Sequence, residues 1–314
     1  MVVQSICLSL VALLLSASVA ARPVKNGFDL AGALLPPTEI RRGGPPRDGI
    51  PAIYTPKFVR ADEQSDVEPD DRVLGVFVGG IAKAYPVAIL DYHEVVNDWT
   101  QDTHMVITYC PLCGSGMAFH AGADGQGVFG VSGLLYNSDV LLYDHGSESL
   151  WSQILGKAIA GPKRGELLDQ IPLAHVKYAQ WLERHPASWV LSRETGYKGI
   201  NYGRGPEGYR GYERSRRIFF PVSSRDDRYH PKSWVLGIQA DGVTKAYPFE
   251  ELRRTSGVVR DRLGEREIIV RYADEAAWAE DDQGNPLTAI RLFWFAWIAF
   301  HPDTEVYTAA AGDG

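Results

Sequence analysis

Two segments of the chain match each other without a gap, and this repeat restricts the possible folds more than any other feature of the sequence. Leu74–Leu90 reads LGVFVGGIAKAYPVAIL, and Leu236–Leu252 reads LGIQADGVTKAYPFEEL. After one inserted residue the match continues with VVND against VVRD, and it then aligns Tyr109 with Tyr272. A match of this length predicts that one structural unit is built twice.

Each copy predicts two strands, a short helix and a third strand. An apolar run turns at a Gly-Gly or Asp-Gly pair and returns, which is typical of a hairpin. Pro86 or Pro248 then stands where the first turn of a helix would begin. A β-rich run, MVITY or IIVRY, follows the helix. We therefore expect a β-rich α+β fold in which two diverged ββαβ repeats pack around a shared core, with a helical segment between them.

The composition along the chain suggests four parts after the first 20 residues. Residues 21–70 are rich in Pro and Asp and predict an extended N-terminal arm. Residues 71–150 form the first copy, and residues 234–314 form the second. The connection, residues 151–233, combines a predicted helix with a loop rich in Gly, Tyr and Arg.

Residues 1–20 have the composition of a signal peptide. Val2–Leu15 is an apolar run, and Ser18-Val19-Ala20 fits the small-x-small rule for cleavage, although no basic residue precedes the run. A buried N-terminal helix is the other interpretation. We expect an exported protein, periplasmic or extracellular, whose mature chain begins near Ala21. No other apolar run is long enough to span a membrane.

The charge pattern argues against nucleic acid as a partner. The net charge is -7, and the sequence contains no basic stripe that would follow a phosphate backbone. A small molecule or a metal ion is the kind of partner that remains.

Several blocks resemble a known family. GVFVGGIAKAYPVAILDYHEVVND, YCPLCGSGMAF, VSGLLYNSDVLLYD, SLWSQ and VLSRETGY are similar to the signature blocks of the uncharacterised prokaryotic family called domain of unknown function 3179. The similarity covers nearly all of the chain after the predicted signal peptide. It implies membership of the family, but it transfers no activity and no catalytic residues.

The two copies differ in the residues that carry chemistry. The first contains Cys110 and Cys113, whereas the aligned positions in the second are Ala273 and Ala276. Residues that only packed the core would be expected in both copies. We therefore interpret the first copy as the one that carries the functional site.

A metal site is the first hypothesis for the cysteine pair. Cys-x-x-Cys-Gly after a strand is similar to half of a zinc knuckle, and a closed zinc site needs two more ligands. His93, from the preceding helix, and His120, from the following strand, are the preferred candidates. Met117 would add a thioether, and a set of soft sulfur ligands selects Cu(I). We expect copper or zinc.

Three alternatives remain open. Cys110 and Cys113 can form a structural disulfide, although a ring this small stabilises a fold by only about 2 kcal/mol. The hypothesis of a thiol-disulfide enzyme is less favoured, because the glycine-rich GSGMAF follows the pair instead of a helix. For a hydrolase, Asp144 and His145 are the candidate acid and base, and Asp139 lies nearby in a predicted turn. No nucleophile-elbow motif supports a serine hydrolase.

Overall fold

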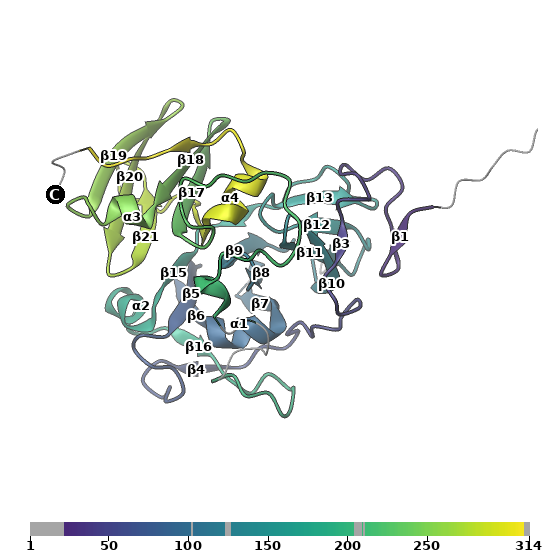
Figure 1. Cartoon of the computed structure of the whole chain (residues 1–314). Coiled ribbons are helices and arrows are strands. Elements are labelled where there is room, and N and C mark those ends of the chain that lie inside the picture. Colours follow the sequence, from purple (N-terminus) through teal and green to yellow (C-terminus); the bar gives the residue numbers. More distant parts are fainter. Residues whose placement is uncertain (1–21, 102, 123–126, 204–208, 210, 311–314) are drawn as a thin grey trace, which may run out of the picture.

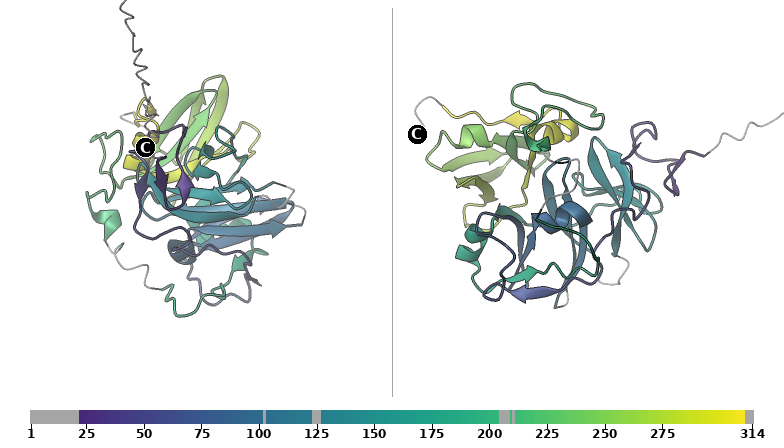
Figure 2. Two further views of the ribbon diagram at one scale, coloured as in Figure 1. Left: turned by 90° about the vertical axis from the view of Figure 1, so that its right-hand side faces the viewer. Right: turned by 60° about the horizontal axis from the view of Figure 1, so that its bottom comes forward.

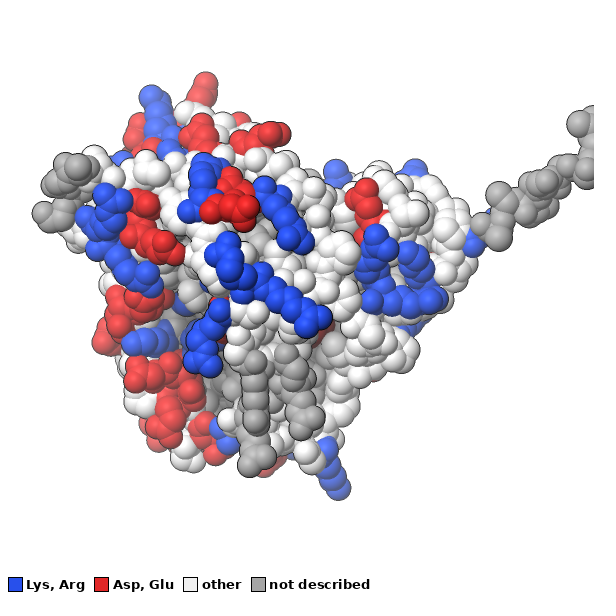
Figure 3. Space-filling view, viewed as in Figure 1, with Lys and Arg blue, Asp and Glu red and all other residues white. Residues whose placement is uncertain are grey.

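The computed structural model describes residues 22–101, 103–122, 127–203, 209 and 211–310 (Figure 1). The predicted signal peptide, its cleavage site and Ala21, the predicted start of the mature chain, lie outside these residues. Among the described residues, no helix combines the length and the apolar character that crossing a membrane requires. On the face in Figure 3, basic and acidic side chains lie beside one another.

The predicted α+β architecture is wrong. Five small, mainly antiparallel sheets are arranged as a five-bladed β-propeller, and β1 and β2 form a separate two-stranded sheet. Figure 2 shows the blades from two further directions. Among the described residues, α-helix is confined to four elements of at most seven residues: α1 (Val87–His93), α2 (Tyr178–Arg184), α3 (Phe249–Leu252) and α4 (Trp294–Phe300). The hairpin pattern was recognised correctly, but each hairpin belongs to its own sheet and not to a single shared layer.

The first part of the chain builds three of the five sheets. One has the order β15-β5-β6-β16-β4, the next β14-β9-β8-β7, and the third β13-β12-β11-β10-β3. Their strands are β3 (Arg41–Arg42), β4 (Phe58–Arg60), β5 (Arg72–Val78), β6 (Ile81–Pro86), β7 (Val95–Thr100), β8 (Thr103–Cys110), β9 (Ser115–His120), β10 (Phe129–Tyr136), β11 (Asp139–Asp144), β12 (Leu150–Ser152), β13 (Lys157–Ala160), β14 (Gln170–Ile171), β15 (Ala174–Lys177) and β16 (Trp189–Leu191).

The last part builds the remaining two sheets. One has the order β22-β17-β18-β23 and the other β19-β20-β21. Their strands are β17 (Trp234–Ala240), β18 (Val243–Pro248), β19 (Val258–Leu263), β20 (Arg266–Ala273), β21 (Ala276–Glu280), β22 (Ile290–Phe293) and β23 (Glu305–Val306). The short strands β1 (Val24–Lys25) and β2 (Phe28–Asp29) and the 3-10 turn η1 (Tyr212–Arg214) complete the set. Neighbouring sheets meet where β7 contacts β10, β15 contacts β21, and β22 contacts β9.

The two matching segments contain the same elements in the same order. The elements β5-β6-α1-β7-β8-β9 correspond to β17-β18-α3-β19-β20-β21. The correspondence extends further, because β15-α2-β16 flanks β5 and β6 as β22-α4-β23 flanks β17 and β18. The predicted helical connection is therefore mostly strand and loop, with α2 as its one α-helix among the described residues.

A sheet inserted in the first half has no counterpart in the second. The elements β10 to β13 lie between β9 and β14, which pair with each other. In the second half, β21 ends at Glu280 and the chain reverses in the short turn Asp281–Asn285, so that Pro286 is bridged to Glu280. This inserted sheet carries Asp139.

In each half, a tryptophan packs flat on a glycine of the central strand. A Cβ atom at Gly75 would lie 2.3 Å from the ring of Trp181, and one at Gly237 would lie 2.2 Å from the ring of Trp297. Both indole N–H groups donate a hydrogen bond, to Ser188 and Thr304 respectively. A strand residue with any side chain would displace the helix that carries the tryptophan.

We predict that Gly75→Ala destabilises the fold by about 1–3 kcal/mol, the usual cost of overpacking a core. Gly237→Ala should have a similar effect. Chemical denaturation measures both, and Gly203→Ala is the control, because its Cβ would lie 3.4 Å from Oδ1 of Asn201, an ordinary contact. A change below about 0.5 kcal/mol in Gly75→Ala, the usual range for surface positions, would contradict the packing.

Candidate metal centre

The two cysteines lie at the ends of a four-residue turn. Strand β8 ends at Cys110, which pairs with Ser115 at the start of β9. The amides of Cys113 and Gly114 donate to the carbonyl of Cys110, at 3.2 and 2.8 Å. Gly114 has a φ of 65°, and a Cβ there would lie 2.6 Å from the ring of Trp234. The turn therefore requires glycine for both its backbone conformation and its packing.

The turn between β10 and β11 places an aspartate beside the cysteines. Tyr136 pairs with Asp139, so Asn137 and Ser138 form a two-residue hairpin turn. Both have positive φ values, 51° and 65°. Such a turn follows the twist of the strands, but a left-handed conformation is costly for a serine.

Three hydrogen bonds hold this strained turn in place. Asn137 donates from Nδ2 to the carbonyl of Ala299 in α4, at 2.8 Å. Its Oδ1 accepts from the amide of Ser223, also at 2.8 Å. Ser138 Oγ donates to the carbonyl of Phe220, at 2.9 Å. Backbone strain that distant segments maintain in this way is a feature of functional sites.

Cys110, Cys113 and Asp139 together form a compact group of metal-ligand atoms. Their donor atoms lie within 4.8 Å of one another, and all three side chains are buried. Both cysteines are free thiols and donate to the carbonyl of Ser138, at 3.8 and 3.4 Å. Asp139 Oδ2 accepts from the amide of Ile154, whereas Oδ1 has no hydrogen-bond partner. Two sulfurs and an unpartnered carboxylate oxygen fit a cation.

Burial opposes ionisation throughout this group. It raises the pKa of both thiols above the usual value, and it raises the pKa of Asp139 to about 7. Glu94, at the C-terminal end of α1, has a pKa of about 8 because it is buried and lies near Asp139. Burial also lowers the pKa of Lys232 to about 8, although the nearby Cys113 acts in the opposite direction. A bound divalent cation would favour the ionised thiolates and carboxylate.

His93 does not join the group. It is buried, and both ring nitrogens already have partners: Nδ1 lies 2.7 Å from the carbonyl of Pro51, and Nε2 lies 2.7 Å from the hydroxyl of Tyr202. In the part of the chain that the structure describes, the cluster of potential His, Cys, Asp and Glu ligands contains no histidine. His93 therefore anchors α1 to two loops.

His120 lies at the opposite end of β9 from the cysteine turn. It pairs with Met105, five residues from Ser115, which corresponds to about 17 Å along a strand. Its Nε2 lies 3.8 Å from a carboxylate oxygen of Asp169, and the side chain is partly exposed. Met117, by contrast, is buried in the same hydrophobic cluster as both cysteines.

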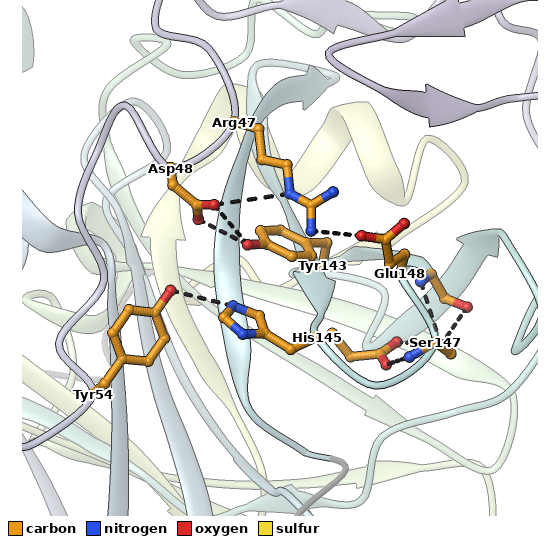
Figure 4. A network of polar contacts seen from close by, with 9 residues as sticks. Arg47, Asp48, Tyr54, Tyr143, His145, Ser147 and Glu148 are labelled. Atoms are coloured by element: carbon orange, nitrogen blue, oxygen red, sulfur yellow. Dashed lines mark hydrogen bonds and ion pairs between the residues drawn. The ribbon is translucent and has the colours of Figure 1, made fainter.

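Asp144 and His145 are held by different partners. Asp144 accepts hydrogen bonds from the amide and hydroxyl of Ser147, at 2.6 and 2.7 Å, and from Trp151 Nε1, at 2.9 Å. His145 is exposed, and its Nε2 lies 3.2 Å from the hydroxyl of Tyr54 (Figure 4). The aspartate thus has a structural role in the turn after β11.

A second polar network surrounds His145. Its ring stacks on Tyr143, whose hydroxyl donates to the carboxylate of Asp48. Arg47 bridges that carboxylate and Glu148, and its guanidinium lies 4.1 Å from the centre of the Tyr143 ring (Figure 4). These contacts fasten the N-terminal arm to β11.

A family model described as "Protein of unknown function (DUF3179)" matches residues 47–284. This chain belongs to the DUF3179 family. No curated protein and no solved structure matches it. The matched region of this DUF3179 protein contains Cys110, Cys113 and Asp139, together with the inserted sheet that brings Asp139 to the cysteines. Membership confirms the resemblance of the sequence blocks and assigns no activity.

The structure corrects one part of the repeat alignment. Ala273 pairs with Ala276 across the two-residue turn Asp274-Glu275, so Ala276 corresponds to Ser115 and not to Cys113. The first half of this DUF3179 chain therefore has two additional residues in the turn. Cys113 lies in this longer turn and has no counterpart in the second half.

We predict that the metal-free protein loses stability as the pH rises from about 4 to 7. Asp139 has a pKa of about 7 when folded against a usual 3.8, so the folded state binds more protons in this window. One such group lowers the free energy of unfolding by up to about 1.4 kcal/mol per pH unit. Glu94 acts in the same direction.

Asp139→Asn should flatten this dependence. Urea denaturation at several pH values, in the presence of a chelator, measures the slope. Glu166→Gln, at an exposed position, controls for the loss of a carboxylate. A slope in Asp139→Asn equal to that of the wild type would show that Asp139 is ionised at all these pH values.

Proposed function

We propose that this DUF3179 protein is an exported metal-binding protein that holds a zinc ion at Cys110, Cys113 and Asp139. The observation that carries the proposal is the unpartnered, buried Asp139 Oδ1 within 4.8 Å of both thiol sulfurs. Zinc binds thiolate and carboxylate ligands, and three protein ligands leave a fourth position for water or another ligand. Closed structural zinc sites use four protein ligands, so an open position is the arrangement typical of catalytic zinc.

The carboxylate is the reason to prefer zinc to copper. Cu(I) is selected by thiolate and thioether ligands, whereas carboxylate oxygens suit harder ions, and zinc accepts both types. Met117 belongs to the same buried cluster and would have to replace Asp139 for a copper site. Copper is therefore the alternative outcome of a metal analysis.

A structural disulfide is the second candidate, and one observation favours it. Both sulfurs lie within 3.8 Å of the same carbonyl oxygen, that of Ser138, so they are close to each other. Export to an oxidising compartment would permit the bond. Thiol-disulfide catalysis is less well supported, because burial raises both thiol pKa values, whereas a reactive cysteine needs a lowered one.

The proposed export rests on the apolar N-terminal segment and its small-x-small end. We predict that protein purified from the native host begins at Ala21 or within two residues of it. Mass spectrometry of the intact protein measures this, and a chain that retains Met1 would contradict export.

We predict that zinc-reconstituted protein contains about one zinc per chain and that Cys110→Ser/Cys113→Ser contains none. Asp139→Asn should weaken binding by more than the about 10- to 100-fold that loss of an outer-shell partner causes. Elemental analysis and competition with a chromogenic chelator measure these quantities. His120→Asn, at the far end of β9, is the matched control and should bind like the wild type.

The same samples separate the alternatives. Circular dichroism should show that the double variant is folded, since the pair alone stabilises the fold by only about 2 kcal/mol if it is oxidised. Two reactive thiols in denatured wild type, with no zinc or copper bound, would refute the metal site. An absence of reactive thiols would establish the disulfide.

A further inference from the structure

A buried pair of nitrogen-bearing side chains lies where the two halves of the chain meet. Strand β15 pairs with β5 and places His175 opposite Leu74, while β22 pairs with β17 and places Arg291 opposite Leu236. Leu74 and Leu236 are aligned in the repeat, so His175 and Arg291 occupy equivalent positions. They are also in contact, because a terminal nitrogen of Arg291 donates to the carbonyl of His175, at 3.2 Å.

These side chains have unused hydrogen-bonding groups. His175 is 3% exposed, and neither ring nitrogen has a partner; Arg291 is 7% exposed, and its Nε has none. A buried nitrogen without a partner costs about 1–3 kcal/mol. Unpartnered groups at this depth are rare, so their presence on neighbouring side chains calls for an explanation, and a bound ion is one.

The charge at this place is unbalanced. Arg291 donates only to main-chain carbonyls, those of His175 and Glu275, among the described residues. The carboxylate of Glu275 is held by Arg253, which it contacts through two hydrogen bonds. The guanidinium of Arg291 is therefore buried without a carboxylate of its own, a costly arrangement for a charged group.

A second guanidinium strengthens the positive field. Arg72 and Arg291 lie over the ring of Trp234, at 5.3 and 4.4 Å from its centre. Glu213 neutralises Arg72 at 2.7 Å. The nearby Asp91 has a pKa raised to about 7 by burial, so it compensates only in part at neutral pH. The aromatic ring offers a stacking surface to both arginines but carries no negative charge.

We propose that His175 and Arg291 bind a small inorganic anion, such as a halide. Arg291 Nε and a ring N–H of His175 would donate to it, and its charge would neutralise the buried guanidinium. Both side chains are buried, so we expect a small anion and not a large organic one. The site takes one residue from β15 and one from β22, so the anion would link the two halves of the chain.

This proposal does not rest on the metal centre, although one side chain borders both the anion site and the cysteine turn. Trp234, which lies under both guanidiniums, also packs against Gly114 in the cysteine turn. Loss of metal binding would leave the anion site intact. Loss of anion binding would be detected separately, as the loss of the increase in Tm that the anion causes.

The test compares thermal unfolding in sodium bromide with that in sodium gluconate at equal ionic strength. Bromide should raise the Tm of the wild type by a few degrees, because a ligand that binds only the folded state stabilises it. Arg291→Met should abolish this rise. His175→Phe, which leaves the guanidinium of Arg291 in place and keeps an aromatic ring at position 175, should reduce the rise in Tm. This second variant keeps the proposal testable if Arg291→Met fails to fold. Arg184→Met, at an exposed arginine, should respond like the wild type.

Crystals grown in bromide provide the direct measurement. Anomalous scattering should show one bromide between Arg291 Nε and the His175 ring. A water molecule in that position, or a bromide-dependent Tm shift that persists in both variants, would overturn the anion site.

Discussion

The cysteine turn depends on contacts from the other half of the chain. The amide of Phe293 donates to the carbonyl of Cys113 at 2.8 Å, and Trp234 packs against Gly114 where no side chain fits. The neighbouring Asn137-Ser138 turn is fixed in turn by the carbonyl of Ala299. Strand β22 and helix α4 therefore brace both parts of the candidate metal centre, which would have neither its backbone conformation nor its burial without them.

The candidate metal centre is costly to the fold without a metal, and the contacts from β22 and α4 hold it in place. The site combines two thiols, the buried carboxyls of Asp139 and Glu94, and a hairpin turn with two residues at positive φ. The buried carboxyls and the turn lower the stability of the metal-free chain at neutral pH, since burial opposes ionisation and left-handed backbone is costly. Buried acids with raised pKa values cluster at functional sites. A cation that favours the ionised forms would turn this cost into binding energy.

The two halves have the same elements but different chemistry. In the first half, the longer turn carries Cys113, and the inserted sheet β10 to β13 supplies Asp139. In the second half, the matching turn has two residues, and the matching connection is the turn Asp281–Asn285. Cys113 and Asp139 of the proposed metal site therefore lie on the additions, whereas Cys110 and the proposed anion site lie on elements that both halves share.

The sequence by itself determined the local units and indicated which half carries the candidate site. Alternating apolar residues, Gly-containing turns and Pro86 or Pro248 specify each hairpin and the helix after it, because these signals act between near neighbours. The sequence also carried the family resemblance and singled out Cys110 and Cys113 as candidate site residues. It named Asp139 as a candidate but gave it a role in a turn, since its distance to the cysteines depends on how two sheets pack.

Tertiary structure alone decided the arrangement of the sheets and the partners of the site. His93 seemed a suitable ligand by its position, yet Pro51 and Tyr202 occupy both ring nitrogens. His120 points away because strand register sets it five residues beyond Ser115. Which sheets of the propeller become neighbours depends on long-range packing of apolar faces, and the sequence carries no local signal for that arrangement. The meeting of His175 with Arg291 follows from the same long-range contacts.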